Sequence, residues 1–411
     1  MKKTLIAVAT AAALTATSAF AEITFGAWLR VLASPVASTG EDVIAGVENS
    51  WGWGARTARI NINGTSEDGK AGFVMGVYND FESGLGQGDD AYLWVKPVDT
   101  VKVSVGKFDS PTNGLRGDFT YGSWNWLRPG NWSYDGEGLT FEGIKRSGMM
   151  LEADPIEGLH AFAVIPMSSS YQSAEEAYRN IQVGFGYAIE GVGKLKAQFI
   201  GDYSYTTKKK EASTYHFDTK TGTGKLDDDV AYDKDEDKTT GQIGVAFDIT
   251  AIENLYVTVG ARFGIADKDY APDYLKMAFT AGASYQVSET MKFSVDGGYK
   301  QYQDKVVGKA GDKKDNEFFV GAGVDYTIMD GLNLAADVRY KNIGYGKEGD
   351  DGAISFLVGV NKSVSSNGSL GIGFQGATNG CGFVQSGGKG LVANEADDFV
   401  WAIPVSIGVW F

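Results

Sequence analysis

Hydrophobic and polar positions alternate along most of the chain with a period of two, which is the period of a β-strand. The segment WAIPVSIGVWF shows the pattern clearly. Large apolar side chains occupy every second position from Trp401 to Phe411, with mostly small residues between them. The same alternation recurs in residues 181–189, 255–265 and 318–328. Long segments with a helical period are missing, so the sequence predicts an all-β fold.

The connections between the predicted strands alternate between short and long. Eight short turns, most with an acidic residue before the next strand, lie near residues 64, 97, 155, 188, 251, 287, 328 and 363. Long polar inserts separate them, and the most charged is 206–238. Eight turns join sixteen strands in pairs, and the unpaired first and last strands bring the predicted number to about 18. Sixteen is the alternative, because residues 139–153 fit either one bulged strand or a hairpin.

An even strand number, with short turns on one side and long inserts on the other, is typical of outer-membrane barrels. No apolar run of about 18 residues follows the N-terminal segment, which excludes a helical membrane span. The sequence therefore predicts one antiparallel transmembrane β-barrel domain over residues 22–411, with periplasmic turns and external loops. Because a closed barrel has no edge, its last strand must pair with its first.

Residues 1–21 have the features of a secretory signal peptide. Two lysines precede an apolar run, and Ala19-Phe20-Ala21 fits a cleavage site. The single cysteine of this exported chain excludes an intrachain disulfide. The net charge of −15 argues against nucleic acid as a partner, since phosphate binding needs clustered Lys and Arg.

Over the whole mature chain, this architecture resembles the Gram-negative porin family, although no motif selects one subfamily. The resemblance implies a water-filled channel for passive diffusion of small hydrophilic solutes and ions. It also implies an outer-membrane location among lipid and lipopolysaccharide, and makes a homotrimer plausible. Phe411 looks like the aromatic signal that the barrel-assembly machinery reads in that family.

The third long insert, residues 109–136, is the candidate constriction loop. In the porin family the third external loop folds into the barrel, and this insert is unusually rich in aromatic residues for a loop in water. Its charged residues Arg116, Asp118 and Arg128 suit a field across a narrow aqueous gap. The alternative is a surface loop packed on the rim or on a neighbouring subunit.

Because every second residue of a strand lies on the same face, a further set of charged and aromatic residues is predicted on the polar strand faces, where they would line the pore. The set comprises Arg30, Arg59, Arg262, Arg339, Asp296, Asp325, Asp337, Trp28 and Trp94. Basic residues outnumber acidic ones on these faces, which predicts a slight anion preference. Alternatively, the charges pair with one another and selectivity is weak. The aromatic residues also leave a sugar-selective porin open.

Other functions find little support in the sequence. The two histidines, His160 and His216, have no serine elbow, HExxH motif or Cys/His cluster beside them, so no enzyme is predicted. An EF-hand beginning at Asp233 fails at Lys238 and Gly244, and no metal or cofactor is expected. The alternative hypotheses are a barrel that anchors structural or adhesive surface loops and, less favoured, a soluble β-sandwich lectin.

Overall fold

A computed structural model gives the structure of most of the predicted strands. It describes residues 22–38, 43–48, 56–79, 85–108, 146–167, 174–206, 215–218, 223–226, 236–266, 271, 274–305, 314–342, 352–378, 385–386, 389–390 and 399–411. The predicted signal peptide and constriction insert, 1–21 and 109–136, lie outside the described residues, as does much of 206–238.

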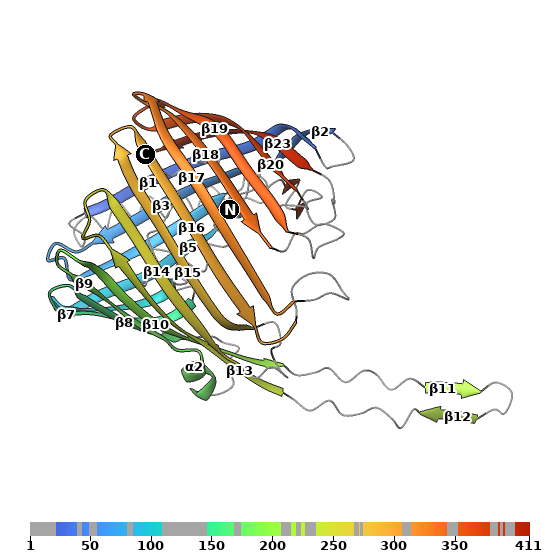
Figure 1. The fold of residues 1–411 in the computed structure, drawn as a ribbon. Helices are drawn as coiled ribbons and strands as arrows, with labels where there is room; N and C mark the ends of the chain where they lie inside the picture. Colours follow the sequence, from blue (N-terminus) through green and yellow to red (C-terminus); the bar gives the residue numbers. More distant parts are fainter. Residues whose placement is uncertain are drawn as a thin grey trace, which may run out of the picture.

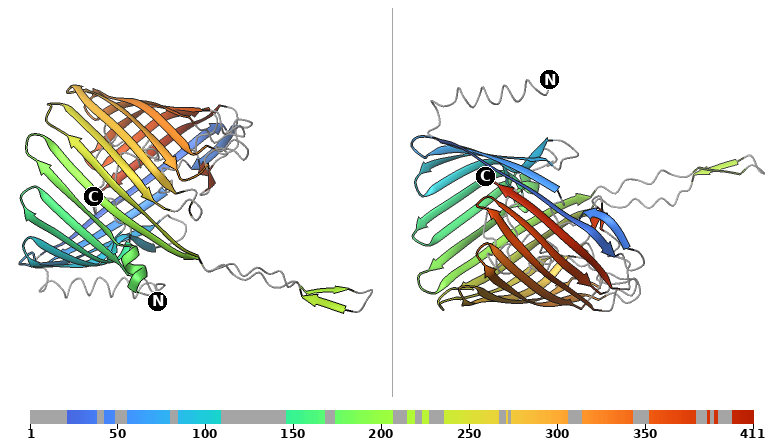
Figure 2. Two further views of the ribbon diagram at one scale, coloured as in Figure 1. Left: turned by 60° about the horizontal axis from the view of Figure 1, so that its bottom comes forward. Right: turned by 90° about the horizontal axis from the view of Figure 1, so that it is seen from above.

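Within this part of the chain, eighteen antiparallel strands close into a barrel, as Figures 1 and 2 show. The strands are β1 (Glu22–Ser38), β3 (Arg56–Thr65), β4 (Ala71–Asn79), β5 (Leu85–Val98), β6 (Val101–Phe108), β7 (Arg146–Ile156), β8 (Leu159–Pro166), β9 (Gln182–Ile189), β10 (Gly193–Thr206), β13 (Glu236–Ile249), β14 (Leu255–Ile265), β15 (Leu275–Ser288), β16 (Met291–Tyr302), β17 (Asn316–Met329), β18 (Leu332–Lys341), β19 (Ala353–Ser365), β20 (Gly368–Ala377) and β23 (Val400–Trp410). The predicted fold class and strand number are confirmed.

The barrel closes where β23 pairs with β1, as the sequence predicted. Trp28 stands opposite Trp410 in this register, and the Phe411 amide donates a 2.7 Å hydrogen bond to the Ala27 carbonyl. On its other side, β1 pairs first with β3 and then with an extra short strand, β2 (Val43–Glu48). The first and last barrel strands therefore have partners on both sides and leave no edge between them.

Short turns join the strands at one end of the barrel. Four of the described turns place glycine in the left-handed region, among them Gly158 at φ 78° between β7 and β8 and Gly331 at φ 70° between β17 and β18. A residue with a side chain would be strained there. In the turn after β3, hydrogen bonds from the Ser66 hydroxyl and the Lys70 amide lower the pKa of Asp68.

The remaining described elements are short. They are α2 (Ala174–Arg179), the hairpin of β11 (Tyr215–Asp218) with β12 (Thr223–Leu226), and the pair β21 (Gln385–Ser386) with β22 (Lys389–Gly390). Figure 1 shows β2, α2 and the β11–β12 hairpin at the end opposite the short turns. No helix in the described ranges is long and apolar enough to cross a membrane.

The two faces of the strands have opposite character, and β14 illustrates this. Val259, Phe263 and Ile265 are exposed on its outer face, whereas Thr258 and Arg262 are buried on its inner face. Neighbouring strands carry the apolar surface around the barrel, with ring contacts such as Phe263 to Phe279 at 5.9 Å between centroids. An apolar outer surface of this kind is solvated by lipid, and it leaves the polar chemistry to the interior.

Candidate functional site

The inner face of β10 to β18 carries buried ion pairs, which we call the charged wall. Its members are Lys196, Asp248, Asp296, Lys300, Glu317, Arg339 and Lys341. All except Lys341, whose side chain is 13% exposed, are buried residues. Charges removed from water in this way must be compensated by partners of opposite sign.

The first pair of the charged wall joins β10 to β13. Lys196 Nζ lies 2.6 Å from Asp248 Oδ2, and their side chains are 2% and 5% exposed. The Thr258 hydroxyl on β14 donates a 2.8 Å hydrogen bond to the other carboxylate oxygen. Both oxygens of Asp248 therefore have a partner, and three strands are tied together on the inner face.

The second pair reaches across a strand. Gly321 of β17 stands opposite Asp296 of β16 on one side and Arg339 of β18 on the other. Because glycine has no side chain, Arg339 Nη2 can approach Asp296 Oδ2 over the backbone of β17, at 3.0 Å. The Arg339 guanidinium also lies 5.6 Å from the centroid of the Phe319 ring.

Glu317 is the centre of the third group of the charged wall. Its carboxylate lies 3.0 Å from Lys341 Nζ and 3.9 Å from Lys300 Nζ, and it accepts a 2.7 Å hydrogen bond from the Tyr302 hydroxyl. On β14, the Arg262 guanidinium donates a 3.4 Å hydrogen bond to the Gln242 side chain of β13. On this side of the barrel, charge is distributed in compensated groups.

Arg59 is held in a similar way on the opposite side of the barrel. It donates hydrogen bonds to Asn61 Oδ1 at 2.5 Å and to the Tyr78 hydroxyl at 3.2 Å, and it lies 3.9 Å from Asp90. The Tyr78 ring in turn meets Trp28 edge to face, with centroids 6.3 Å apart. The predicted pore residues Arg59 and Trp28 stand opposite each other in the β1–β3 register, and Tyr78 contacts both.

A different surface covers the inner face of β5 to β8. Phe108, Met150, Phe162 and Val164 form a buried cluster with Tyr92 packed against it, and we call these five residues the apolar wall. The rings of Tyr92 and Phe108 lie 5.1 Å apart. Such a patch is unexpected on the face that should meet water in a channel.

Trp94 extends this surface towards the short turns. A Cβ atom added to Gly72 would come within 2.5 Å of the Trp94 ring, so the indole lies directly over that glycine. Lys96 Nζ is 5.9 Å from the ring centroid on the same strand. The predicted pore residue Trp94 therefore lies against β4 at Gly72.

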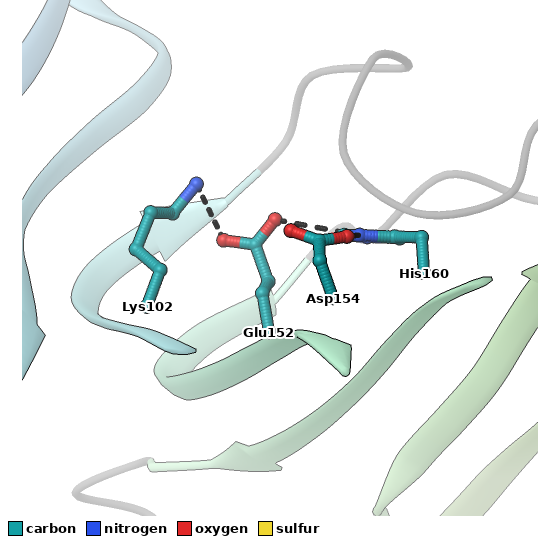
Figure 3. Close-up of polar contacts among 4 residues, drawn as sticks. All are labelled: Lys102, Glu152, Asp154 and His160. Atoms are coloured by element: carbon teal, nitrogen blue, oxygen red, sulfur yellow. Dashed lines mark hydrogen bonds and ion pairs between the residues drawn. The ribbon is translucent and has the colours of Figure 1, made fainter. Parts of the chain in front are cut away.

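Figure 3 shows a chain of four polar side chains. The strand register places it next to the apolar wall, because Glu152 stands opposite Phe162, and close to the turn between β7 and β8. Lys102 Nζ lies 2.5 Å from Glu152 Oε2, Glu152 Oε1 lies 3.9 Å from His160 Nε2, and His160 Nδ1 lies 2.8 Å from Asp154 Oδ1. We call these residues the mouth cluster. Among the described residues, no group of three or more His, Cys, Asp and Glu side chains is arranged to hold a metal ion.

The other predicted site residues have varied positions. Asp337 is buried on β18, and Asp325 is partly exposed on β17. Arg30 lies on β1 opposite Thr57 and Gly408, and its side chain is outside the description. Arg116, Asp118 and Arg128 also fall outside the described residues.

Sequence reasoning missed the apolar wall and the mouth cluster. On β8 the signal was ambiguous, because LHAFAVIP carries apolar residues on both faces. His160 was noticed but set aside because no catalytic motif accompanies it. Its partners Glu152 and Asp154 stand at alternate positions of β7, on one face, which is a signal that could have been used.

The family comparison decides the assignment. The family model described as "Porin subfamily" matches residues 160–368, just over half of the 411 residues. The chain belongs to the porin family. The matched region of this porin begins in β8 and ends in β20, so it includes the whole charged wall.

Solved structures match this porin over nearly its whole length at low sequence identity. A triple mutant of the Rhodopseudomonas blastica porin is 14% identical with a TM-score of 0.46, covering 95% of this chain and 100% of that chain. The anion-selective porin from Comamonas acidovorans is 14% identical with a TM-score of 0.45, at 95% and 99% coverage. OmpT of Vibrio cholerae in its trimer form is 13% identical with a TM-score of 0.43, and the match covers 95% of this chain and 99% of that chain. No curated protein matches the sequence.

Family membership and a closed barrel with a polar interior together establish the general function. The porin is an outer-membrane channel, through which small hydrophilic solutes and ions cross by passive diffusion. This family and this fold are those of a channel rather than an enzyme.

Proposed function

We propose that residues 109–136 narrow this diffusion channel by packing against the apolar wall. The support is the position of that wall. The chain leaves β6 at Phe108, itself a member of the apolar wall, and re-enters the barrel in β7, which carries Met150. Six aromatic residues of the insert need apolar surface to cover, and the wall offers it where the insert starts. A loop docked there would reduce the free cross-section of the lumen.

In this proposal the charges of the insert decide the ion preference at the narrowest point. The charged wall is compensated in pairs, which favours weak selectivity from the wall itself over the anion preference expected from counting bases. Arg116, Asp118 and Arg128 would then contribute the net charge that a passing ion meets. Among these three residues, two arginines against one aspartate favour anions slightly at the narrowest point, whereas Asp109 and Asp135 near the ends of the insert bring its total charge to −1.

The proposal includes the partners of the channel. We expect a homotrimer in an outer membrane of lipid and lipopolysaccharide, after export directed by residues 1–21. Assembly by the barrel-assembly machinery would use Phe411, whose side chain is 77% exposed while its backbone bonds β1. No catalytic residue and no cofactor is assigned.

Single-channel recording tests the constriction. The variant Arg116→Ala/Arg128→Ala removes two positive charges from the insert, and we expect a higher conductance. We also expect the reversal potential in a salt gradient to move towards cation selectivity by about twofold in permeability ratio. The charge-matched control is Lys208→Ala/Lys209→Ala in the 206–238 loop, which should leave both quantities near wild type.

Equal behaviour of the two double variants would contradict a constriction at 109–136 and leave the channel itself intact. The rim or subunit contact would then be the better location for the aromatic insert. Cross-linking of the detergent-purified protein checks the trimer separately, because an exclusively monomeric channel would contradict only that part.

A further inference from the structure

The mouth cluster differs from the charged wall in its contact with water. Side chains of the pairs Lys196–Asp248 and Arg339–Asp296 are at most 6% exposed. In the mouth cluster the exposed fractions are 28% for Lys102, 16% for Glu152, 35% for His160 and 65% for Asp154. An ion in the lumen therefore meets the charge of the mouth cluster more directly than that of the buried pairs.

The register of β6, β7 and β8 places the mouth cluster on one patch of the inner face. Lys102 stands opposite Glu152, Glu152 stands opposite Phe162 of the apolar wall, and Asp154 reaches His160 across the β7–β8 hairpin. The patch lies next to the Glu157-Gly158 turn, at the end that is periplasmic in barrels of this class. Figure 3 shows the four side chains in a row, with His160 beside both carboxylates.

We propose that the proton on His160 sets the ion preference of this porin at its periplasmic mouth. With a neutral imidazole, one lysine and two carboxylates give the mouth cluster a net charge of −1. With an imidazolium, both ring nitrogens carry protons facing carboxylates, and the net charge is 0. Histidine is the side chain whose charge ordinarily changes between about pH 5 and about pH 8. The inference rests on the channel function and is independent of a constriction at 109–136.

The strands around His160 bring few competing charges to it. β7 contributes Glu152 and Asp154, β6 contributes Lys102, and β5 beyond it contributes Lys96. On β9, the residue opposite His160 is Gly186, followed by Ala188, and neither titrates.

Beyond β9, the inner face of β10 carries Lys194 and Lys196. Lys196 is paired with Asp248, and Lys194 stands opposite Asp248 in the strand register. Of the side-chain types that meet here, histidine is the one whose charge ordinarily changes in the pH range in question. The protonation of His160 is therefore the event that changes the charge of this patch.

Acidification should consequently lower the cation-to-anion permeability ratio. Removing one negative charge at about 10 Å from a passing ion changes the cation-to-anion permeability ratio about 1.5- to 2-fold in dilute salt. The change should fade in about 1 M salt, where the Debye length falls to about 3 Å.

The experiment uses the full-length porin in planar bilayers under a KCl gradient of about 10 to about 100 mM, where screening is weak. The reversal potential is measured from about pH 5.5 to about pH 8, the range of histidine titration. The cation-to-anion permeability ratio of wild type should fall on acidification. His160→Gln should keep the alkaline value throughout, and His160→Arg should keep the acidic value throughout. The control is His216→Gln, the other histidine of the chain, which should behave as wild type.

Asp154→Asn gives a second measurement that leaves the histidine in place. It removes one negative charge from an exposed position, so its permeability ratio at about pH 8 should equal that of wild type at about pH 5.5. A wild-type response that persists in both His160 variants, or disappears in His216→Gln, overturns the inference. A folded protein without conductance steps would instead contradict the channel function.

Discussion

The inner face of this porin has two stretches of opposite character. The apolar wall on β5 to β8 buries Phe108, Met150, Phe162 and Val164. The charged wall on β10 to β18 buries ion pairs such as Lys196–Asp248 and Arg339–Asp296. Both face the interior of the same barrel, and both are largely shielded from solvent.

The difference shows that the alternation of a barrel strand fixes only its outer face. Lipid demands apolar side chains outside, but the interior accepts either packed hydrocarbon or compensated charge. A packed hydrocarbon surface and a set of compensated charges respond differently to substitution. Hydrocarbon loses contacts gradually, whereas an ion pair that loses one partner leaves a buried charge.

The largest effect on stability is expected where a single substitution leaves a buried charge without its ion-pair partner. Asp248→Ala removes the partner of Lys196 and should lower the free energy of unfolding by about 3–5 kcal/mol. The double variant Lys196→Met/Asp248→Leu removes both charges and should recover most of the loss. Urea unfolding of the protein refolded into lipid vesicles measures both. A double variant no more stable than Asp248→Ala would show that the wall does not depend on charge compensation.

A smaller effect is expected in the apolar wall. Met150→Ala removes buried hydrocarbon and leaves a cavity, so the free energy of unfolding should fall by about 3 kcal/mol. Its neighbour Leu151 is 45% exposed on the outer face and provides a matched control. Leu151→Ala loses its transfer free energy, about 2 kcal/mol, but lipid chains fill the space and no cavity remains. The same unfolding assay compares them, and equal losses would mean that the apolar wall is not tightly packed.

The architecture was predictable because its signals are local. Each short turn lies within a few residues, as Glu157-Gly158 and Asp330-Gly331 illustrate, and the alternation on β14 assigns both faces without knowledge of other strands. The pairing of β23 with β1 also follows from the sequence, because a barrel without an edge requires it.

The site was less predictable because its contacts depend on register between strands. Parity placed Arg339 and Asp296 on inner faces, but only the register shows that Gly321 lies between them and lets them meet. The contact of His160 was unpredictable for the same reason, since its hydrogen bond with Asp154 crosses the hairpin of β7 and β8. Counting bases against acids cannot find these pairs, and the anion preference that the count predicts stays a prediction.

Two buried hydroxyl groups extend the comparison to uncharged polar side chains. On the charged wall, the Thr258 hydroxyl donates to Asp248 at 2.8 Å. Thr258→Val keeps the shape of the side chain and removes that donor to a charged acceptor, which should cost about 1.5 kcal/mol of unfolding free energy. In the background of Lys196→Met/Asp248→Leu the same substitution should be nearly neutral, and a full loss there would assign the effect to packing.

The smallest effect is expected for the hydroxyl on the apolar side. Ser104 on β6 is fully buried, and its oxygen has no hydrogen-bond partner among the residues that the structure describes. Ser104→Ala removes a polar group that already bears its desolvation cost, so stability should stay within about 0.5 kcal/mol of wild type or rise. A clear loss would mean that this hydroxyl is bonded after all, and that the stretch next to Trp94 is wetter than the apolar wall beside it. Unfolding of Ser104→Ala and Thr258→Val in one assay therefore separates a dry packed surface from a compensated polar one.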